Sequence, residues 1–274
     1  FEVKEDFFTG TRSAAFGGTT TVLDMPNTVP AADNARALEE KLDIVREKAN
    51  VDFGLFAQLS DVDEIARMAP MAVGFKLFMA ETTSAGPSTA SLEVLLNNPH
   101  LKGRVITVHA EDPGQFSRGE CADLHMHNQI RNMKAESEAL RKILSIETPA
   151  KLNIAHLTTA ECVDMARKRK TSFEITPHHA LLDEMMPIGT RGKVNPPLRK
   201  RAIADKLFDV LKSGRAIIAS DHAPHTNKEK SLDFPMAPSG LPGVETRIPL
   251  MLALAQKGVL KHQAVQDMCC QLPA

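Results

Sequence analysis

Short apolar segments alternate with amphipathic segments along the whole chain. The apolar segments span residues 19–25, 52–59, 74–80, 104–110, 151–157, 172–179 and 216–224. Nearly continuous apolar runs of this length are typical of parallel strands that are covered on both faces. The pattern therefore predicts seven strands of a largely parallel sheet.

The segments between the strands carry the helical repeat of apolar positions. Within residues 33–49, Leu38 and Val45 fall on one helical face. The same repeat predicts helices over residues 6–16, 88–98, 121–146, 159–169, 200–213 and 245–257, and a short helix that starts at Asp61. Thr9 or Thr11 is expected to cap the first of them.

Regular alternation of strands and helices predicts an α/β fold. A TIM-type (β/α)8 barrel whose first strand is missing fits the count, because a helix that opens the chain implies a strand before it. We expect residues 1–274 to form this incomplete barrel with strands two to eight. The alternative is an open doubly wound sheet, which is disfavoured because no G-x-G-x-x-G opens a helix after the first strand.

Composition and charge narrow the range of partners. Lys and Arg number 33 against 34 Asp and Glu, which disfavours nucleic acid or an anionic membrane as the main partner. No apolar run approaches the ~20 residues of a membrane-spanning helix, and no signal peptide is apparent. The four cysteines are too few for a disulfide scaffold, so we expect a cytoplasmic protein that acts on a small molecule.

Polar residues follow five of the predicted strands. These residues are Lys76, His109, His156, His178 and His179, and the group Asp221, His222 and His225. One such histidine is more often a hydrogen-bonded core residue, but five strand ends that agree are hard to explain structurally. The carboxyl ends of barrel strands meet at one face, and imidazoles and carboxylates that converge there are the ligands of a zinc-type site.

Lys76 lies between Phe75 and Leu77 in an apolar strand, where desolvation lowers the pKa of an amine. A neutral amine can add carbon dioxide and become a carbamate, which is an anion able to bridge two metals. The alternative is a lysine that points out of the barrel or pairs with an acid such as Glu81.

His125 and His127 form an H-x-H pair that follows no strand. On a helix, residues two apart point about 200° away from each other, so the pair cannot easily chelate one ion. We interpret both as surface or helix-packing histidines.

Several strings of the chain resemble the type I dihydroorotase family of the amidohydrolase superfamily, in the family's order. They are GTRSAAFGGTTTVLDMPNTVP (10–30), GFKLFMAETT (74–83), VHAED (108–112), AHLTT (155–159), EITPHHALL (174–182), KVNPPLR (193–199), ASDHAPHT (219–226) and APSGLPGVET (237–246). MPNT, VNPPLR and SDHAPH are together quite specific. Allantoinases and hydantoinases, which are relatives in the superfamily, remain alternatives.

The resemblance implies a role for each matching residue. Lys76 would be a carboxylated lysine that bridges two zinc ions, and His109 and His156 would be imidazole ligands of the second ion. Asp221 would bind metal and shuttle protons.

The resemblance also implies which residues contact the substrate. They are Asn27, Asn195, His225 and Thr82, the last in the loop 81–84 that closes over the ligand. His178 and His179 would surround the metal ligands.

The implied activity is the reversible cyclisation of N-carbamoyl-L-aspartate to dihydroorotate, the ring-closing step of pyrimidine synthesis. A homodimer is implied as well, with association with other pyrimidine enzymes as an alternative. The family's H-x-H-x-R strand is expected just before Phe1, and a C-terminal tail that helps to form a small β-sandwich is expected after Ala274. A catalytically silent scaffold subunit is the alternative from a different class.

Overall fold

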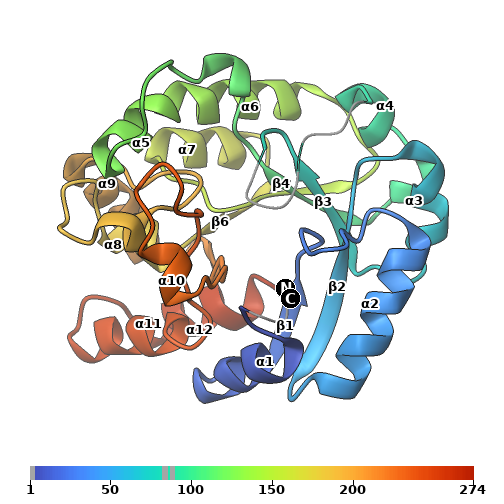
Figure 1. The fold of residues 1–274 in the computed structure, drawn as a ribbon, viewed down its shortest axis with the longest axis horizontal. Coiled ribbons are helices and arrows are strands. Elements are labelled where there is room, and N and C mark those ends of the chain that lie inside the picture. The colour runs from blue at the N-terminus through green and yellow to red at the C-terminus, as the bar shows by residue number, and fades with distance from the viewer. Residues whose placement is uncertain (1–3, 82–85, 87–89) are drawn as a thin grey trace.

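The computed structural model describes residues 4–81, 86 and 90–274. Its centre is a curved sheet of seven parallel strands in the order in which they occur in the chain (Figure 1). The strands are β1 (Thr21–Asp24), β2 (Asp52–Gln58), β3 (Gly74–Phe78), β4 (Val105–His109), β5 (Lys151–Ile154), β6 (Ser172–Ile175) and β7 (Ile217–Ile218). This sheet confirms the predicted α/β barrel architecture.

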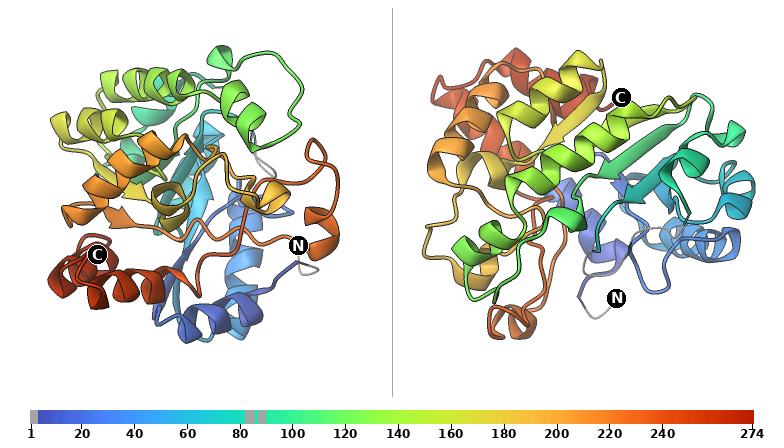
Figure 2. Two further views of the ribbon diagram at one scale, coloured as in Figure 1. Left: turned by 90° about the vertical axis from the view of Figure 1, so that its left-hand side faces the viewer. Right: turned by 90° about the horizontal axis from the view of Figure 1, so that it is seen from above.

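The helices cover the outer, convex side of the sheet, as Figures 1 and 2 show. They are α1 (Phe7–Phe16), α2 (Ala35–Lys48), α3 (Val62–Met68), α4 (Leu92–Leu96), α5 (Leu124–Ile130), α6 (Met133–Ser145), α7 (Ala160–Lys168), α8 (Pro177–Leu181), α9 (Arg201–Lys212), α10 (Asn227–Lys230), α11 (Arg247–Gln256) and α12 (His262–Gln266). None of the helices in the described ranges is long and apolar enough to cross a bilayer.

The strands are apolar on both faces because both faces are buried. Phe75 and Leu77 of β3 pair in register with Ile106 and Val108 of β4, and all four side chains are fully buried. One set of alternate residues packs against the helices and the other fills the barrel interior. The polar residues of these strands therefore stand out as costly exceptions.

Within the described residues the sheet does not close, because β7 and β1 do not pair with each other. Leu23 of β1 is correspondingly half exposed. The additional strand expected before Phe1 would lie in this gap. It stays a prediction.

The expected single helix over residues 121–146 is wrong, because the structure has two helices with a break between them. α5 ends at Arg131 as its C-cap, and Asn132 adopts an extended backbone and caps α6. The Asn132 side chain accepts a hydrogen bond from the backbone amide of Ala135, which competes with helix continuation. The break leaves the carbonyl oxygen of Arg131 available to another partner.

Other boundaries differ from the expected ones for local reasons. Asp6, not a threonine, caps α1, and Thr9 completes a capping box as its third residue. The expected strand 172–179 ends at Ile175, because Thr176 caps α8 and Pro177 opens it. The expected strand 216–224 is regular only over Ile217–Ile218.

The central packing of the barrel can be tested with a matched pair of isoleucines. Ile143 on α6 is fully buried, whereas Ile44 on α2 is 44% exposed. We expect Ile143→Ala to lower the free energy of unfolding by about 2–5 kcal/mol, because it removes buried methyl groups and leaves a cavity. Ile44→Ala should change it by less than about 1 kcal/mol. Urea unfolding measures both, and equal losses would contradict this packing.

Candidate active site

Three candidate metal ligands emerge at or just beyond the carboxyl ends of strands. His109 is the last residue of β4, His156 lies two residues after β5, and Asp221 lies three residues after β7. His156 and Asp221 have left-handed backbones, with φ of 38° and 46°. Non-glycine residues rarely adopt this conformation, and such strain concentrates at functional sites.

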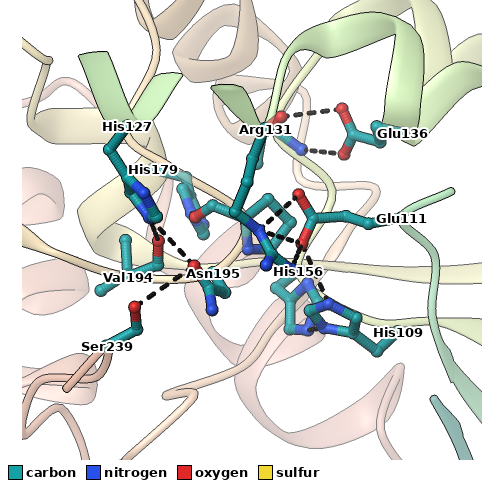
Figure 3. A network of polar contacts seen from close by, with 12 residues as sticks. His109, Glu111, His127, Arg131, Glu136, His156, His179, Val194, Asn195 and Ser239 are labelled. Carbon is teal, nitrogen blue, oxygen red and sulfur yellow. Dashed lines mark hydrogen bonds and ion pairs between the residues drawn. The ribbon is translucent and has the colours of Figure 1, made fainter. Parts of the chain in front are cut away.

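The two imidazoles of His109 and His156 face each other inside the barrel (Figure 3). Nδ1 of His109 lies 3.0 Å from Nε2 of His156, and both side chains are buried. The other ring nitrogen of His109, Nε2, lies 3.0 Å from Oε2 of Glu111. Since a carboxylate oxygen accepts hydrogen bonds, Nε2 carries the hydrogen and the Nδ1 lone pair is directed into the site. Burial lowers the pKa of both histidines and keeps them neutral.

Glu111 is held in place by Arg131, the C-cap residue of α5. Nε of Arg131 donates to Oε2 of Glu111 at 3.1 Å, and Glu111 is completely buried. Burial opposes ionisation of this carboxyl group, but Arg131 and His109 together hold its pKa well below the usual range. Arg199, also buried, donates from Nη1 to the carbonyl oxygen of Arg131 at 2.6 Å. The break between α5 and α6 thus supplies the acceptor that anchors Arg131.

Lys76 of β3 lies inside the barrel, with only 4% of its surface exposed. Burial lowers the pKa of its amine, while the nearby charges of Glu174 and Asp221 act in the opposite direction. The charge of Lys76 in turn lowers the pKa values of His109 and His156. Lys76 therefore shares one electrostatic environment with all three other candidate ligands, which contradicts the alternative of an outward-pointing lysine.

The Asp221 side chain is about one third exposed, at 34%. Desolvation raises the pKa of its carboxyl group to about 6, although Lys76 acts to lower it. Nε2 of His178 lies 4.0 Å from Oδ2 of Asp221 and has no hydrogen-bond partner within the described residues. A carboxyl group in this environment can hold and release a proton near neutral pH.

These residues fit a divalent metal. Two zinc-bound nitrogens in tetrahedral geometry lie about 3.3 Å apart, given Zn–N bonds of about 2.0–2.1 Å, so His109 and His156 need only a small adjustment. The contact from His109 to Glu111 matches the carboxylate that commonly supports a metal-binding histidine. In residues 4–81, 86 and 90–274, no three His, Cys, Asp or Glu side chains converge as a complete metal site. Within these described residues, His109 and His156 form two ligands of the expected metal site.

Two of the candidate substrate-binding residues are joined through Ser239. Oγ of Ser239 donates to Oδ1 of Asn195 at 3.3 Å, and its carbonyl oxygen accepts from Nε2 of His225 at 2.9 Å. Nδ1 of His225 accepts from Lys4 at 2.9 Å. Asn27 follows β1, and no contact of the described residues joins it to this group. Thr82 lies outside the described residues.

Of the two interpretations of His127, packing of the helix is confirmed and a surface position is wrong, because the residue lies on the buried side of α5. Its side chain is 5% exposed, and Nε2 lies 3.0 Å from both the carbonyl oxygen of Val194 and Oδ1 of Asn195. His125 contacts Glu184 instead, so the two histidines do not share a partner, as expected from their spacing.

Four further residues near the site were not predicted from the sequence: Glu111, Arg131, Glu174 and Arg199. Glu111 and Arg199 lie in the strings VHAED and VNPPLR, and Glu174 is an acidic residue inside an apolar strand. A buried charge in such a strand is a signal that could have identified Glu174. The contacts of Arg131 and Arg199 cross between distant elements, and no local pattern indicates them.

The curved parallel sheet and the polar groups at its carboxyl end define an amidohydrolase-type barrel. The chain superposes over 98% of its length on the L-hydantoinase (dihydropyrimidinase) from Arthrobacter aurescens, with a TM-score of 0.90 and 27% identity. A dihydroorotase from Saccharomyces cerevisiae shares the fold, with a TM-score of 0.80 and 19% identity over 96% of this chain and 78% of that one. No protein-family model matches the chain.

Sequence relatives then specify the family. The chain is 37% identical to a dihydroorotase from Halobacterium salinarum, covering 100% of this chain and 67% of that protein. It is 36% identical to a dihydroorotase from Methanosarcina mazei, covering 94% of this chain and 62% of that protein. The chain belongs to the dihydroorotase family. It spans less than two thirds of the length of several of these relatives.

The raised pKa of Asp221 can be tested in metal-free protein. Because the pKa in the folded state, about 6, lies above the ordinary value of 3.8, folding favours the protonated carboxyl group. The resulting stabilisation is present below about pH 4 and is lost as the pH rises through about 6. We expect the free energy of unfolding to fall over this interval more in the native protein than in Asp221→Asn, which cannot titrate. A carboxyl titration near pH 4 by NMR would contradict this assignment.

Proposed function

We propose that the protein is a dihydroorotase, which interconverts N-carbamoyl-L-aspartate and dihydroorotate plus water. One observation carries the proposal: His109 and His156 face each other at the carboxyl end of the barrel, with 3.0 Å between Nδ1 and Nε2, and Lys76 is buried in the neighbouring strand β3. These groups have the chemistry of a metal-dependent hydrolase, and the family of the chain specifies the cyclic amide.

The proposed cofactor is a pair of zinc ions held by Lys76, His109, His156 and Asp221. When bound, they would supply Lewis-acid polarisation of the scissile carbonyl and activation of water. Glu111 would keep Nδ1 of His109 directed toward the metal, since the hydrogen-bonded carboxylate fixes both the tautomer and the ring orientation.

Lys76 would act as a carbamate in this proposal. Its buried amine has a lowered pKa, which favours the neutral nucleophile. The ammonium group would first release one proton, and the neutral nitrogen would then form a bond to the carbon of carbon dioxide and release a second proton, so that the cation becomes an anion. Desolvation raises the pKa of the partly buried Glu174, and this shift toward the neutral form would lessen repulsion of the new charge.

Asp221 would move the proton that ring opening requires. Its carboxylate would accept a proton from the attacking water and deliver it to the departing ring nitrogen. In the direction of synthesis it would take the proton from the ureido nitrogen. Asn27, Asn195 and His225 would hold the dianionic substrate in the orientation for attack.

Two other functions remain candidates. A hydantoinase is the alternative because the chain superposes on the enzyme from Arthrobacter aurescens, but the higher sequence identity to dihydroorotases disfavours it. A silent scaffold subunit is disfavoured because Lys76, His109, His156 and Asp221 are all present.

The four unpaired cysteines support a reducing compartment, and we propose the cytoplasm.

The proposed function is tested by ring opening with the protein that contains residues 1–274, using dihydroorotate, hydantoin and allantoin as parallel substrates. Dihydroorotate should have the highest kcat/KM. We expect Asp221→Ala to lower kcat by at least about 100-fold, because the proton-transfer group is lost. Asp209→Ala, at an exposed position on α9, is the control and should retain activity. A preference for hydantoin, or normal turnover by Asp221→Ala, would refute the proposal.

Metal binding is tested separately through Glu111. We expect Glu111→Gln to weaken zinc binding by about 10–100-fold, because the neutral amide supports His109 less strongly than a carboxylate does. Competition with a chromophoric chelator measures the affinity without any catalytic assay. Glu184→Gln is the matched control, since Glu184 is also buried and contacts a histidine, His125, at 2.9 Å. Equal zinc affinities for the two variants would contradict this role of Glu111.

A further inference from the structure

We propose that His127 and Ser239 are positioning residues that fix the side-chain amide of Asn195, so that its NH2 group faces the substrate. The inference rests on the proposed function, in which Asn195 contacts the substrate. It adds that an oxygen atom of the substrate, carboxylate or carbonyl, must lie opposite the amide nitrogen.

The contacts of His127 determine which of its ring nitrogens carries the hydrogen. Nε2 lies 3.0 Å from the carbonyl oxygen of Val194, which can only accept a hydrogen bond, so Nε2 carries the ring hydrogen. Burial lowers the pKa of His127 to about 4, so the ring is neutral at neutral pH. Nδ1 then holds a lone pair, and the thiol of Cys121 lies 3.3 Å from it as a donor.

The contacts to Oδ1 determine the orientation of the Asn195 side-chain amide. The donor Nε2 of His127 lies 3.0 Å from Oδ1, and Oγ of Ser239 lies 3.3 Å from the same oxygen. The one N–H of His127 is thus shared between the carbonyl oxygen of Val194 and Oδ1 of Asn195, and the Ser239 hydroxyl donates to the same Oδ1. Because an N–H group faces this side of the amide, the oxygen lies here and the NH2 group on the other side. Figure 3 shows the Asn195 nitrogen pointing away from both His127 and Ser239.

The backbone carbonyl groups on both sides of Asn195 accept hydrogen bonds from buried histidines. The carbonyl oxygen of Val194 on one side contacts His127, and that of Pro196 on the other side accepts from Nε2 of His179 at 2.8 Å. Both histidines are buried and neutral, because burial lowers the pKa of each to about 4. The segment 194–196 is therefore held at two carbonyls by two rigid side chains.

Among the described residues, the hydrogen bonds of the Asn195 side chain all reach Oδ1 and none involves the amide nitrogen, and the residue is only partly buried. The ammonium group of neighbouring Lys193 donates to the carbonyl oxygens of Phe234 and Ala237 at 2.7 Å. It therefore does not replace Asn195 as a donor to the substrate. Asn195 thus presents two N–H donors of fixed direction. A substrate with an acceptor at this point gains two possible hydrogen bonds, whereas one with an N–H group there meets a donor and is rejected.

The test uses steady-state kinetics with dihydroorotate and the protein that contains residues 1–274. His127→Leu removes the donor at similar volume, and we expect KM to rise about tenfold with kcat within about threefold of the native value. His127→Gln restores an N–H near the position of Nε2 and should return KM to within about threefold. Ser239→Ala, which removes the second donor, should raise KM by a smaller factor.

His125→Leu is the matched control on the same helix, two residues away and partly exposed, and should leave KM unchanged. Equal KM values for His127→Leu and His127→Gln, or a loss in kcat alone, would overturn the positioning role. A second measurement does not depend on activity: the side-chain nitrogen of Asn195 should show the 15N–{1H} relaxation of a rigid group in the native protein and that of a more mobile group in His127→Leu, because the hydrogen bond to Oδ1 restricts rotation of the amide about χ2. If dihydroorotate is not a substrate but this NMR difference is found, the proposed function fails while the positioning of Asn195 stands.

Discussion

The burial of several ionisable groups at one end of the barrel is the constraint on which the rest of the structure depends. Lys76, His109 and His156 are almost completely buried, and Glu174 and Asp221 lie within the range of their charges. Isolated charges in such a place are costly, so the groups either become neutral or compensate one another. The structure does both: burial shifts the histidines and Lys76 toward their neutral forms and raises the pKa of Asp221 to about 6. Burial of these residues lowers the stability of the folded state, and the same burial gives them the pKa values that metal ligands and proton carriers need.

A second layer of buried charges keeps this group in place. Glu111 contacts His109, and Arg131 contacts Glu111 (Figure 3). Arg199 donates to the carbonyl oxygen of Arg131. Arg199 also donates to Oγ1 of Thr158, which in turn donates to the buried Glu136. The network connects α5, α6 and the segment before α9 to the end of β4, so the ring of His109 is oriented from several elements at once. Removing one member leaves a buried charge without its partner, which costs more than the pair contributes.

The sequence was sufficient for the parts of the structure that follow from local pattern. The strand positions followed from apolar runs, and the polar group at their carboxyl ends followed from single residues such as Lys76 and His109 that interrupt these runs. It was insufficient where the outcome depends on distant partners. The break at Asn132 interrupts a good helical repeat, because capping of α6 and the contact from Arg199 outweigh helix propensity. His127 has no local signal, since its partner Asn195 lies 68 residues away. Glu111 lies in the string VHAED, which resembles the family, but its contact with His109 could be seen only in the folded structure.

The central proposal is that Lys76, His109, His156 and Asp221 together hold divalent metal at the carboxyl end of the barrel. Anomalous X-ray scattering at the zinc edge, from crystals of the protein grown with zinc, tests it most directly. The account predicts a peak within about 2–2.3 Å of Nδ1 of His109 and Nε2 of His156, with density for a carboxylated Lys76 side chain beside it. A zinc-loaded crystal with peaks only elsewhere, or with the rings of His109 and His156 turned away from each other, would contradict the account.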